Sequence, residues 1–342
     1  MDKKGIFQAI ASLAKTVTPV IAVEKIYQGM FGHHFYSHKQ FAFSWSDFPT
    51  LEREKHTFIS HDKKQLIGYI YTQKGLQNKG IFVFSHGYGG GGHHCYLDLI
   101  NVVTKMGYFV FAYDATANDE SEGDSIKGFT QGLLDCDKAI SYVEKLRRFK
   151  DMPLYLFGHS WGAYSVSNAL EFHPRVKGVI ALSGFNEATS IFEANGGMYA
   201  GDKGLEFYEH IRNHEIELFG AMATHTAIES FKKSKAKVFI AHSLNDTTVP
   251  ISAGYNLYIR EFENNRRFKF VRFLNRGHGT IYITFEGIDY INHINSTYNS
   301  FIKEEDRTDK QKDTFLKKLI DRKKYSNLVD VSFIKEAINF IK

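Results

Sequence analysis

The chain has 342 residues, of which 43% are hydrophobic and 24% are charged. This composition is that of an ordinary globular protein, and it excludes a disordered chain, a collagen and a coiled coil. The formal net charge of +5 is spread along the chain, so nucleic acid is not expected as a partner. The two cysteines, Cys95 and Cys136, cannot form a disulfide framework and lack the spacing of zinc ligands. We therefore predict a reducing, cytoplasmic location.

The N-terminal segment combines lysines with an apolar stretch, which Lys15 divides into two runs too short to cross a bilayer. Four apolar side chains of this segment follow helical spacing: Ile6, Ile10, Leu13 and Val17. We therefore predict an amphipathic helix that packs on the rest of the protein. Two alternatives stay open, a helix that lies on a membrane surface and a signal for secretion.

Strand patterns begin at residues 56–72, which indicate two strands joined by a polar turn. Short, mainly apolar runs then alternate with helical patterns. These runs are residues 80–85, 108–113, 153–157, 176–182, 237–241 and 268–274. Buried strands separated by helical crossovers are typical of a mostly parallel sheet with helices on both faces. We predict this α/β architecture, with the chemistry at the carboxyl ends of the strands.

The most informative motif follows the third of these runs, where residues 158–162 read Gly-His-Ser-Trp-Gly before a helical pattern begins. A serine on a sharp turn from strand to helix needs small neighbours, because a side chain at either glycine would collide with the backbone. The following helix also directs its N-terminal amides and the positive end of its dipole at the serine. The motif therefore predicts that Ser160 is a nucleophile.

With this motif, the chain resembles the α/β-hydrolase superfamily, and in particular its serine-aminopeptidase-like and monoacylglycerol-lipase-like branch, over about residues 56–300. The HG-x-x oxyanion motif of that branch stands here at residues 86–89. The resemblance implies an α/β-hydrolase fold. It also implies that the backbone amides of Tyr88 and Trp161 bind the oxyanion.

A second family motif, D-x-R-G-x-G-x-S-x-G, is only partly kept. The matching residues are Asp114, Ser121 and Gly123, whereas Thr116, Ala117 and Asp119 replace the family's Arg, Gly and Gly. The fold prediction does not depend on these three positions, but the shape of the loop and its contacts with substrate do.

The resemblance also implies a catalytic acid and a base that follow the serine in the chain, each after a late strand. Asp246 lies four residues before Pro250, as in the family's D-x-x-V-P pattern, and His278 follows the last apolar run. A serine hydroxyl needs a base to take its proton, and the base needs a carboxylate to orient it. We therefore predict a catalytic triad of Ser160, Asp246 and His278.

Between residues 182 and 237 no clear strand pattern is present, and many relatives carry a cap at this place. We predict a helical cap insertion over Ser160 at about residues 185–234. The expected domains are an N-terminal helical extension (1–40), the hydrolase domain (41–300) and a C-terminal helical extension (301–342). The candidate substrate-binding residues are His159, Phe192, Met198 and Phe207.

No cofactor and no metal are expected. The five histidines considered as metal ligands lack a His-Glu-x-x-His pattern, which favours loop or surface positions for them. They are His33, His34, His38, His93 and His94. Residues 89–92 are four glycines without the Lys-Ser/Thr of a phosphate-binding loop. We expect them to form a flexible wall beside the oxyanion site.

The C-terminal region carries charges of both signs at residues 303–324, which predicts a solvated helix. Four apolar residues then form a second amphipathic stripe: Phe333, Ile334, Ile338 and Ile341. This stripe can dock on the core, pair with a second chain or touch a membrane, and the sequence does not choose among them.

The predicted function is that of a serine hydrolase, which cleaves small-molecule carboxylic esters through a covalent acyl-enzyme. One alternative is a peptidase or amidase that uses the same triad on a short peptide or amide. The other is a noncatalytic binding protein, because a fold does not determine a function. The oligomeric state is not predicted.

Overall fold

The computed structural model describes residues 18–200, 202–304 and 306–342. The helix predicted around Ile6 to Val17 lies outside the described residues. The described residues form an eight-stranded sheet of order β1-β2-β4-β3-β5-β6-β7-β8. Its strands are β1 (Leu51–Ile59), β2 (Gln65–Gln73), β3 (Ile81–Ser85), β4 (Phe109–Tyr113), β5 (Leu154–His159), β6 (Val176–Leu182), β7 (Lys237–Ser243) and β8 (Phe268–Phe273).

The sheet is antiparallel at one edge and parallel elsewhere. β1 and β2 form the predicted hairpin, and β2 pairs antiparallel with β4. From β4 to β8 every neighbouring pair is parallel. The central strands β3 and β5 are buried along their whole length, as expected of strands covered on both faces. Each apolar run in the sequence is a strand.

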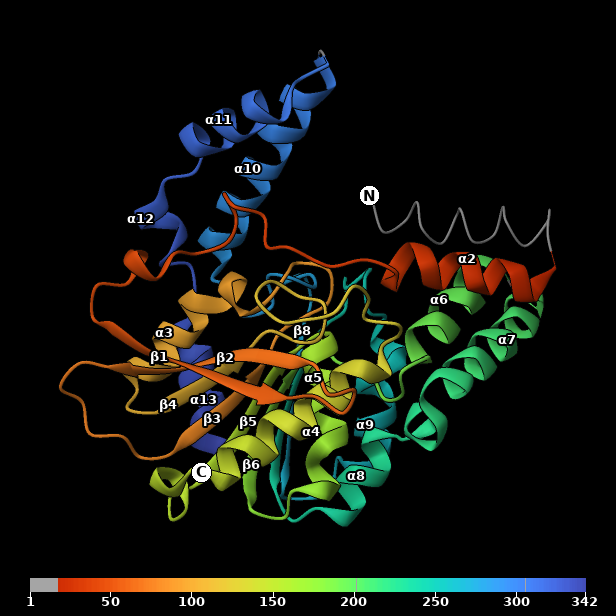
Figure 1. The fold of residues 1–342 in the computed structure, drawn as a ribbon, viewed down its shortest axis with the longest axis horizontal. Helices are drawn as coiled ribbons and strands as arrows, with labels where there is room; N and C mark the ends of the chain where they lie inside the picture. Colours follow the sequence, from red (N-terminus) through yellow and green to blue (C-terminus); the bar gives the residue numbers. More distant parts are fainter. Residues whose placement is uncertain (1–17, 201, 305) are drawn as a thin grey trace.

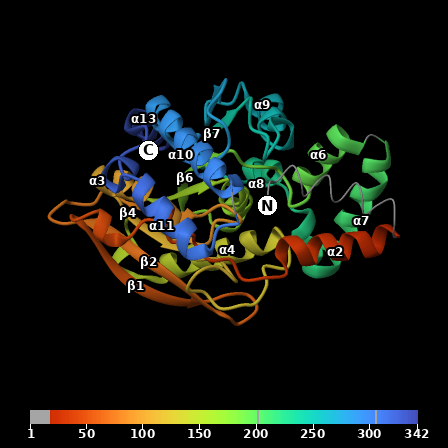
Figure 2. The same ribbon diagram turned by 90° about the horizontal axis from the view of Figure 1, so that it is seen from above.

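Helices cover both faces of the sheet (Figures 1 and 2). They are α2 (Pro19–Phe31), α3 (Leu97–Lys105), α4 (Thr130–Lys145), α5 (Trp161–Ala169), α6 (Ser190–Ala200), α7 (Asp202–Phe219), α8 (Ala227–Lys233), α9 (Tyr255–Phe262), α10 (Phe285–Glu304), α11 (Asp309–Leu319), α12 (Arg322–Tyr325) and α13 (Val331–Ile341). Two short 3-10 helices also matter below, η1 (Trp45–Asp47) and η2 (His93–Tyr96). α4 and α5 pack on one face and α3 and α13 on the other.

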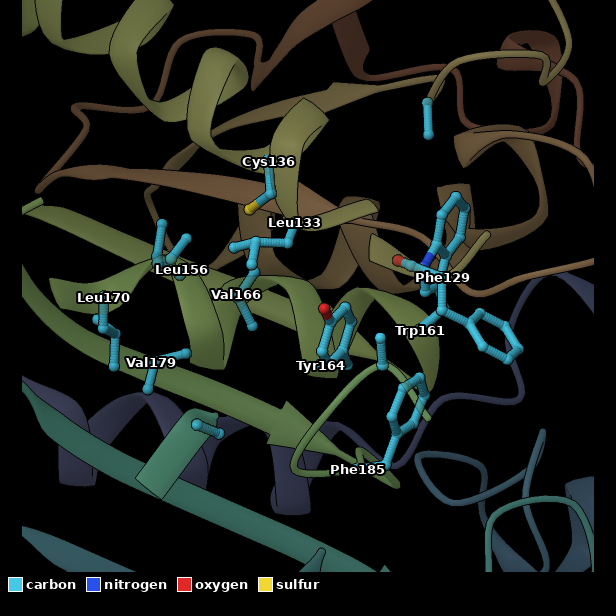
Figure 3. Packing of buried hydrophobic residues seen from close by; sticks show 14 of the residues in the cluster. Phe129, Leu133, Cys136, Leu156, Trp161, Tyr164, Val166, Leu170, Val179 and Phe185 are labelled. Carbon is cyan, nitrogen blue, oxygen red and sulfur yellow. The ribbon is translucent and has the colours of Figure 1, made fainter. Parts of the chain in front are cut away.

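The part of the core that lies beneath Ser160 is the layer between α5 and the sheet. Figure 3 shows Val166 of α5 lying over Leu156 of β5 and Val179 of β6, and all three are fully buried. Farther along, the rings of Tyr164 and Phe185 stack at a centroid distance of 4.8 Å. This packing fixes the start of α5 against the ends of β5 and β6.

The region predicted as a cap, residues 185–234, carries α6, α7 and α8. α2 packs on α7 (Figure 1), where Tyr27 donates a hydrogen bond to Glu215 at 2.6 Å. The Glu215 carboxyl also accepts hydrogen bonds from the amide and hydroxyl of Thr130, at 2.8 and 2.7 Å, at the start of α4. Burial raises the pKa of Glu215, although these hydrogen bonds oppose the shift. One buried carboxyl thus joins α2, α7 and α4.

In the C-terminal region, α10 and α11 pack on each other, and the stacked rings of Phe301 and Phe315 have a centroid distance of 3.9 Å. α13 docks on the sheet, and its apolar stripe of four side chains is at most 5% exposed. Of the three alternatives for this stripe, the structure therefore has the one in which it covers the core. Among the described residues, no helix combines the length and the apolar content needed to cross a bilayer.

Candidate active site

Ser160 lies between the end of β5 and the first residue of α5. Its backbone has φ 57° and ψ −120°, a conformation that L-residues rarely adopt. The turn is held because the Ser160 amide donates to the carbonyl of Leu182 at 2.8 Å, and the Ser160 carbonyl accepts from the amide of Tyr164. The side chain is thereby directed away from the sheet, and the residue is 8% exposed.

The two glycines of the motif are required by close backbone contacts on either side of this turn. A Cβ added at Gly158 would lie 2.2 Å from the carbonyl oxygen of Gly162. A Cβ added at Gly162 would lie 2.0 Å from the carbonyl oxygen of Ser85, at the end of β3. The start of α5 therefore abuts the segment that leads into residues 86–89.

The structure brings the three predicted triad residues together. His278 Nε2 lies 2.8 Å from the Oγ of Ser160, and His278 Nδ1 lies 2.7 Å from the Oδ2 of Asp246. A neutral imidazole with its proton on Nδ1 donates to the carboxylate and accepts from the serine hydroxyl. This hydrogen-bond order is the one that a serine nucleophile and its base require.

Asp246 is 6% exposed and is held as a carboxylate by several donors. Its Oδ1 accepts from the amides of Thr248 and Val249, both at 2.9 Å. Its Oδ2 lies 3.3 Å from His242 Nε2, in addition to the hydrogen bond from His278. Burial by itself raises the pKa of Asp246, but the two histidines outweigh it and hold that pKa well below the usual carboxyl range.

The loop that carries His278 is anchored by residues that spacing does not reveal. The hydroxyl of Ser243, at the end of β7, accepts from the amides of Arg276 and Gly277 at 2.9 and 3.2 Å. The guanidinium of Arg276 is 2.7 Å from the carboxylate of Asp330, which caps α13. The loop of His278 is thus positioned by β7 and by the start of α13, whose contacting residues lie 33 and 54 positions from Arg276 in the sequence.

The predicted oxyanion amides belong to neighbouring residues. Tyr88 and Trp161 contact each other edge to face, with a ring centroid distance of 6.2 Å. Among the residues that the structure describes, no acceptor bonds to the backbone amide of either one. The Tyr88 hydroxyl donates to the carbonyl of Met30 at the end of α2, so the side chain already has a hydrogen-bond partner. Both amides are available to a bound oxygen.

His159, a candidate substrate-binding residue, has both ring nitrogens in the framework of the site. Nε2 lies 3.0 Å from the carbonyl of His278, so it carries the proton and donates. Nδ1 then accepts from the hydroxyl of Tyr96 at 2.9 Å, and the same hydroxyl accepts from the Gly87 amide at 3.1 Å. His159 therefore joins three segments: the turn at Ser160, the loop that carries His278, and residues 86–89, which we call the oxyanion loop.

The other candidate substrate-binding residues have different surroundings. Phe192 is 3% exposed, and its ring centroid lies 5.8 Å from that of Phe129. The ring centroid of Phe129 in turn lies 5.3 Å from that of Tyr88. Phe207 is a buried member of the same hydrophobic cluster. The side chain of Met198 lies outside the described residues. The ring of Phe129 therefore lies between Phe192 and Tyr88 and contacts both.

The expectation of loop or surface positions is wrong for His93, which is fully buried in η2. Its Nδ1 lies 2.6 Å from the Oδ1 of Asp114 and its Nε2 lies 2.7 Å from the hydroxyl of Tyr71. His93, His94 and Asp114 are close enough to hold a metal ion together. Because both ring nitrogens of His93 already have protein partners, this group fits a structural hydrogen-bond network better than a metal site.

The expectation of a flexible glycine wall is also wrong for two of the four glycines. A Cβ added at Gly91 would lie 2.2 Å from the Ser37 amide nitrogen, and one at Gly92 would lie 1.8 Å from the Asp114 carboxylate. Only Gly89 and Gly90 have open space around the added atom. Close packing against Ser37 and Asp114 therefore explains why positions 91 and 92 are glycines.

Comparison with known proteins shows similarity in the part of the chain that carries the serine. A family model described as serine aminopeptidase, S33, matches residues 77–195. A monoglyceride lipase of Rattus norvegicus is 29% identical over 130 residues, which make up 36% of this chain and 41% of the rat protein. The match thus spans about two fifths of the length of that curated relative.

Solved structures show similarity over a larger part. An esterase of Pyrococcus furiosus superposes with a TM-score of 0.56 at 18% identity, over 80% of this chain and 96% of the esterase. An acylaminoacyl peptidase of Pyrococcus horikoshii superposes with a TM-score of 0.51 at 18% identity, over 67% of this chain and 38% of the peptidase. At such identities the likeness concerns the fold alone, and it confirms the fold that the sequence predicts.

Proposed function

We propose that this chain cleaves carboxylic esters through an acyl-enzyme on Ser160, because it has the α/β-hydrolase fold and resembles serine aminopeptidases and monoglyceride lipases around that serine. The observation that supports this proposal is the unbroken hydrogen-bond order from Asp246 through His278 to Ser160. A serine on a turn of positive φ, bonded to an imidazole that is itself bonded to a buried carboxylate, is prepared for nucleophilic attack.

In the first half of the reaction, the Oγ of Ser160 attacks the ester carbonyl while His278 Nε2 takes the hydroxyl proton. The imidazolium that forms is stabilised by the carboxylate of Asp246, whose lowered pKa keeps it ionised. The negative oxygen of the tetrahedral intermediate is bound by the amides of Tyr88 and Trp161, each worth about 3 kcal/mol by comparison with similar donors.

Collapse of the intermediate breaks the bond to the alcohol, and His278 returns its proton to that leaving oxygen. The acyl group is then bonded to Ser160. In the second half, His278 takes a proton from water as the water oxygen attacks the acyl carbon. The carboxylic acid leaves and Ser160 recovers its proton. No redox step is involved, and the atoms balance as ester plus water giving acid plus alcohol.

The experiment that tests this proposal is labelling of the purified protein with a fluorophosphonate probe. Wild type should label, and Ser160→Ala should lose labelling and lose at least about 10³-fold in the hydrolysis of nitrophenyl esters. Ser183→Ala is the matched control, because Ser183 is a buried serine at the end of β6 whose hydroxyl has no hydrogen-bond partner among the described residues. Labelling of Ser160→Ala at the wild-type rate would refute the proposal.

The second candidate is a peptidase or amidase, which the serine aminopeptidase description of residues 77–195 favours. The same triad can cleave an amide if His278 protonates the leaving nitrogen. Nitrophenyl esters and aminoacyl nitroanilides with the same acyl group separate the two candidates. A higher kcat/KM for the anilides would replace the esterase proposal, whereas a wild-type protein that does not label at all would favour the noncatalytic alternative.

A further inference from the structure

A cavity of about 780 Å³ lies between two segments that flank the hydrolase core. One wall comes from the segment 36–47, which includes η1, and a second from the end of α11 and the start of α12. The rest of the lining is Arg53, His94, Asp119 and Glu120. Arg322 of α12 joins these walls, because its guanidinium donates to the carbonyls of Gln40 and Ala42 at 2.9 and 3.0 Å. Figure 1 shows the segment after α2 reaching this end of the molecule beside α12.

The apolar part of the cavity is formed by Phe43, Trp45 and Ile320. Phe43 and Ile320 are buried, whereas Trp45 is 45% exposed. The Nε1 of Trp45 donates to the carbonyl of Leu51, which fixes the orientation of the indole. A large aromatic side chain that is held in place and still exposed offers apolar surface to a ligand at a low entropic cost.

The charged part of the cavity is formed by three exposed cations, Lys39, Arg53 and Lys317. Among the described residues, none of the three forms an ion pair with a carboxylate. The guanidinium of Arg53 instead lies over the rings of Trp45 and Tyr69, at 5.4 and 4.9 Å from their centroids. Three unneutralised cations around one concavity concentrate positive potential there.

The carboxylates that line the same cavity are already engaged. Asp47 is paired with Arg322, and Glu120 is paired with Lys55. The carboxylate of Asp119 accepts from the amide and hydroxyl of Ser37 and from the amide of Gly92. The lining therefore presents three cations without a carboxylate partner, whereas two of its three carboxylates are paired with cations and the third is hydrogen-bonded.

We propose that this cavity is a second binding site, separate from Ser160, for an amphiphilic organic anion. Its acidic group, a carboxylate or a phosphate, binds among Lys39, Arg53 and Lys317, and its apolar body lies against Trp45 and the neighbouring apolar wall. The cations supply the charge-assisted hydrogen bonds and the aromatic wall supplies the apolar contact that such a ligand needs. The proposal does not depend on the esterase activity.

The test uses the intrinsic fluorescence of the full chain, which has two tryptophans, Trp45 in this cavity and the buried Trp161. The probes are decanoate, decyl phosphate and decanol, which share an alkyl chain and differ in the headgroup. We expect a saturable fluorescence change with at least one anion, with a dissociation constant about tenfold or more below that of decanol. The tighter of the two anions identifies the acidic group. Equal binding of decanol, or no change with any probe, would overturn the proposal.

Substitutions then assign the site. Arg53→Gln and Lys317→Gln should each weaken binding of the anion about fivefold, because each removes one exposed positive charge. Lys318→Gln is the matched control, since Lys318 is the next residue of α11, is exposed and does not line the cavity. Trp45→Phe should abolish the fluorescence change. Unaltered affinity in both charge variants, or a fluorescence change that persists in Trp45→Phe, would place the anion elsewhere and overturn the proposal.

Discussion

Replacement of Gly162 by alanine tests whether the start of α5 positions the oxyanion amides. A Cβ at this position would lie 2.0 Å from the carbonyl oxygen of Ser85 and 2.8 Å from that of His86. A carbon and a carbonyl oxygen that are not bonded stay about 3.3 Å apart, so the helix start and the end of β3 must separate by about 1.3 Å. Two carbonyls of the backbone block the new atom, and neither can rotate away as a side chain would.

The separation acts on the two residues whose amides are proposed to bind the oxyanion. Trp161 immediately precedes Gly162, and Tyr88 follows His86 by two residues. A misplacement of about 1 Å between reacting groups costs about 10²-fold in rate. We therefore expect Gly162→Ala to lower kcat/KM for a nitrophenyl ester about 10²-fold. The overpacked contact should also destabilise the fold by about 1–3 kcal/mol.

The assay measures kcat/KM and the rate of fluorophosphonate labelling at a temperature well below the unfolding midpoint, so that both variants are folded. Gly90→Ala is the matched control, because a Cβ there meets nothing within 4 Å although Gly90 belongs to the same loop region as Tyr88. It should keep activity within about twofold. If Gly162→Ala keeps more than half of the wild-type activity, the start of α5 does not set the oxyanion geometry.

Three shorter predictions concern neighbouring residues. Tyr88→Phe keeps the amide but loses the hydrogen bond to Met30, so kcat/KM should stay within about threefold while stability falls by about 1 kcal/mol in urea unfolding. His159→Phe should lower the labelling rate about 10- to 100-fold, because it unties the turn from the loop of His278, and His159→Gln should recover most of it by keeping a donor and an acceptor. Asp119→Asn should cost about 2 kcal/mol of stability at pH 7. Burial raises the pKa of Asp119, but the hydrogen bonds from its donors lower it further than burial raises it. The stabilisation by the Asp119 carboxylate is therefore present above the unfolded-state pKa of about 3.9 and is lost as the pH falls through the folded-state pKa. A stability difference that stays constant between pH 7 and pH 3 would contradict the last prediction.

The sequence predicts the sheet well because each buried strand is a short local pattern. The run at residues 176–182 coincides with β6, and β5 extends two residues beyond its predicted end to His159. The order of Ser160, Asp246 and His278 could also be predicted, since each residue follows a strand end and family motifs mark the spacing. Local periodicity and short motifs need no knowledge of distant contacts.

The supports of the site could not be predicted, because their partners are far apart in the chain. Tyr96 reaches His159 across 63 residues, and Ser243 reaches the amide of Arg276 across 33. Nothing in the spacing of a tyrosine or a serine indicates such a partner. The one available signal was the position of His242, four residues before Asp246 in the same strand-to-loop segment. The burial of His93 was missed for the same reason, since the partners of its ring come from β2 and from the loop after β4.

One of the three departures from the family loop, Asp119, has a physical cause in the segment that follows α2. Phe35 forms a bridge with Asn118, and its amide donates to the carbonyl of Ala117. Asp119 has φ 38°, a value that glycine adopts freely and aspartate tolerates, and its carboxylate accepts both the amide and the hydroxyl of Ser37. A glycine at 119 would leave these donors of Ser37 without an acceptor. The side chain of Asp119 therefore binds a segment outside the resemblance, and the same carboxylate holds the amide of Gly92 beside residues 86–89.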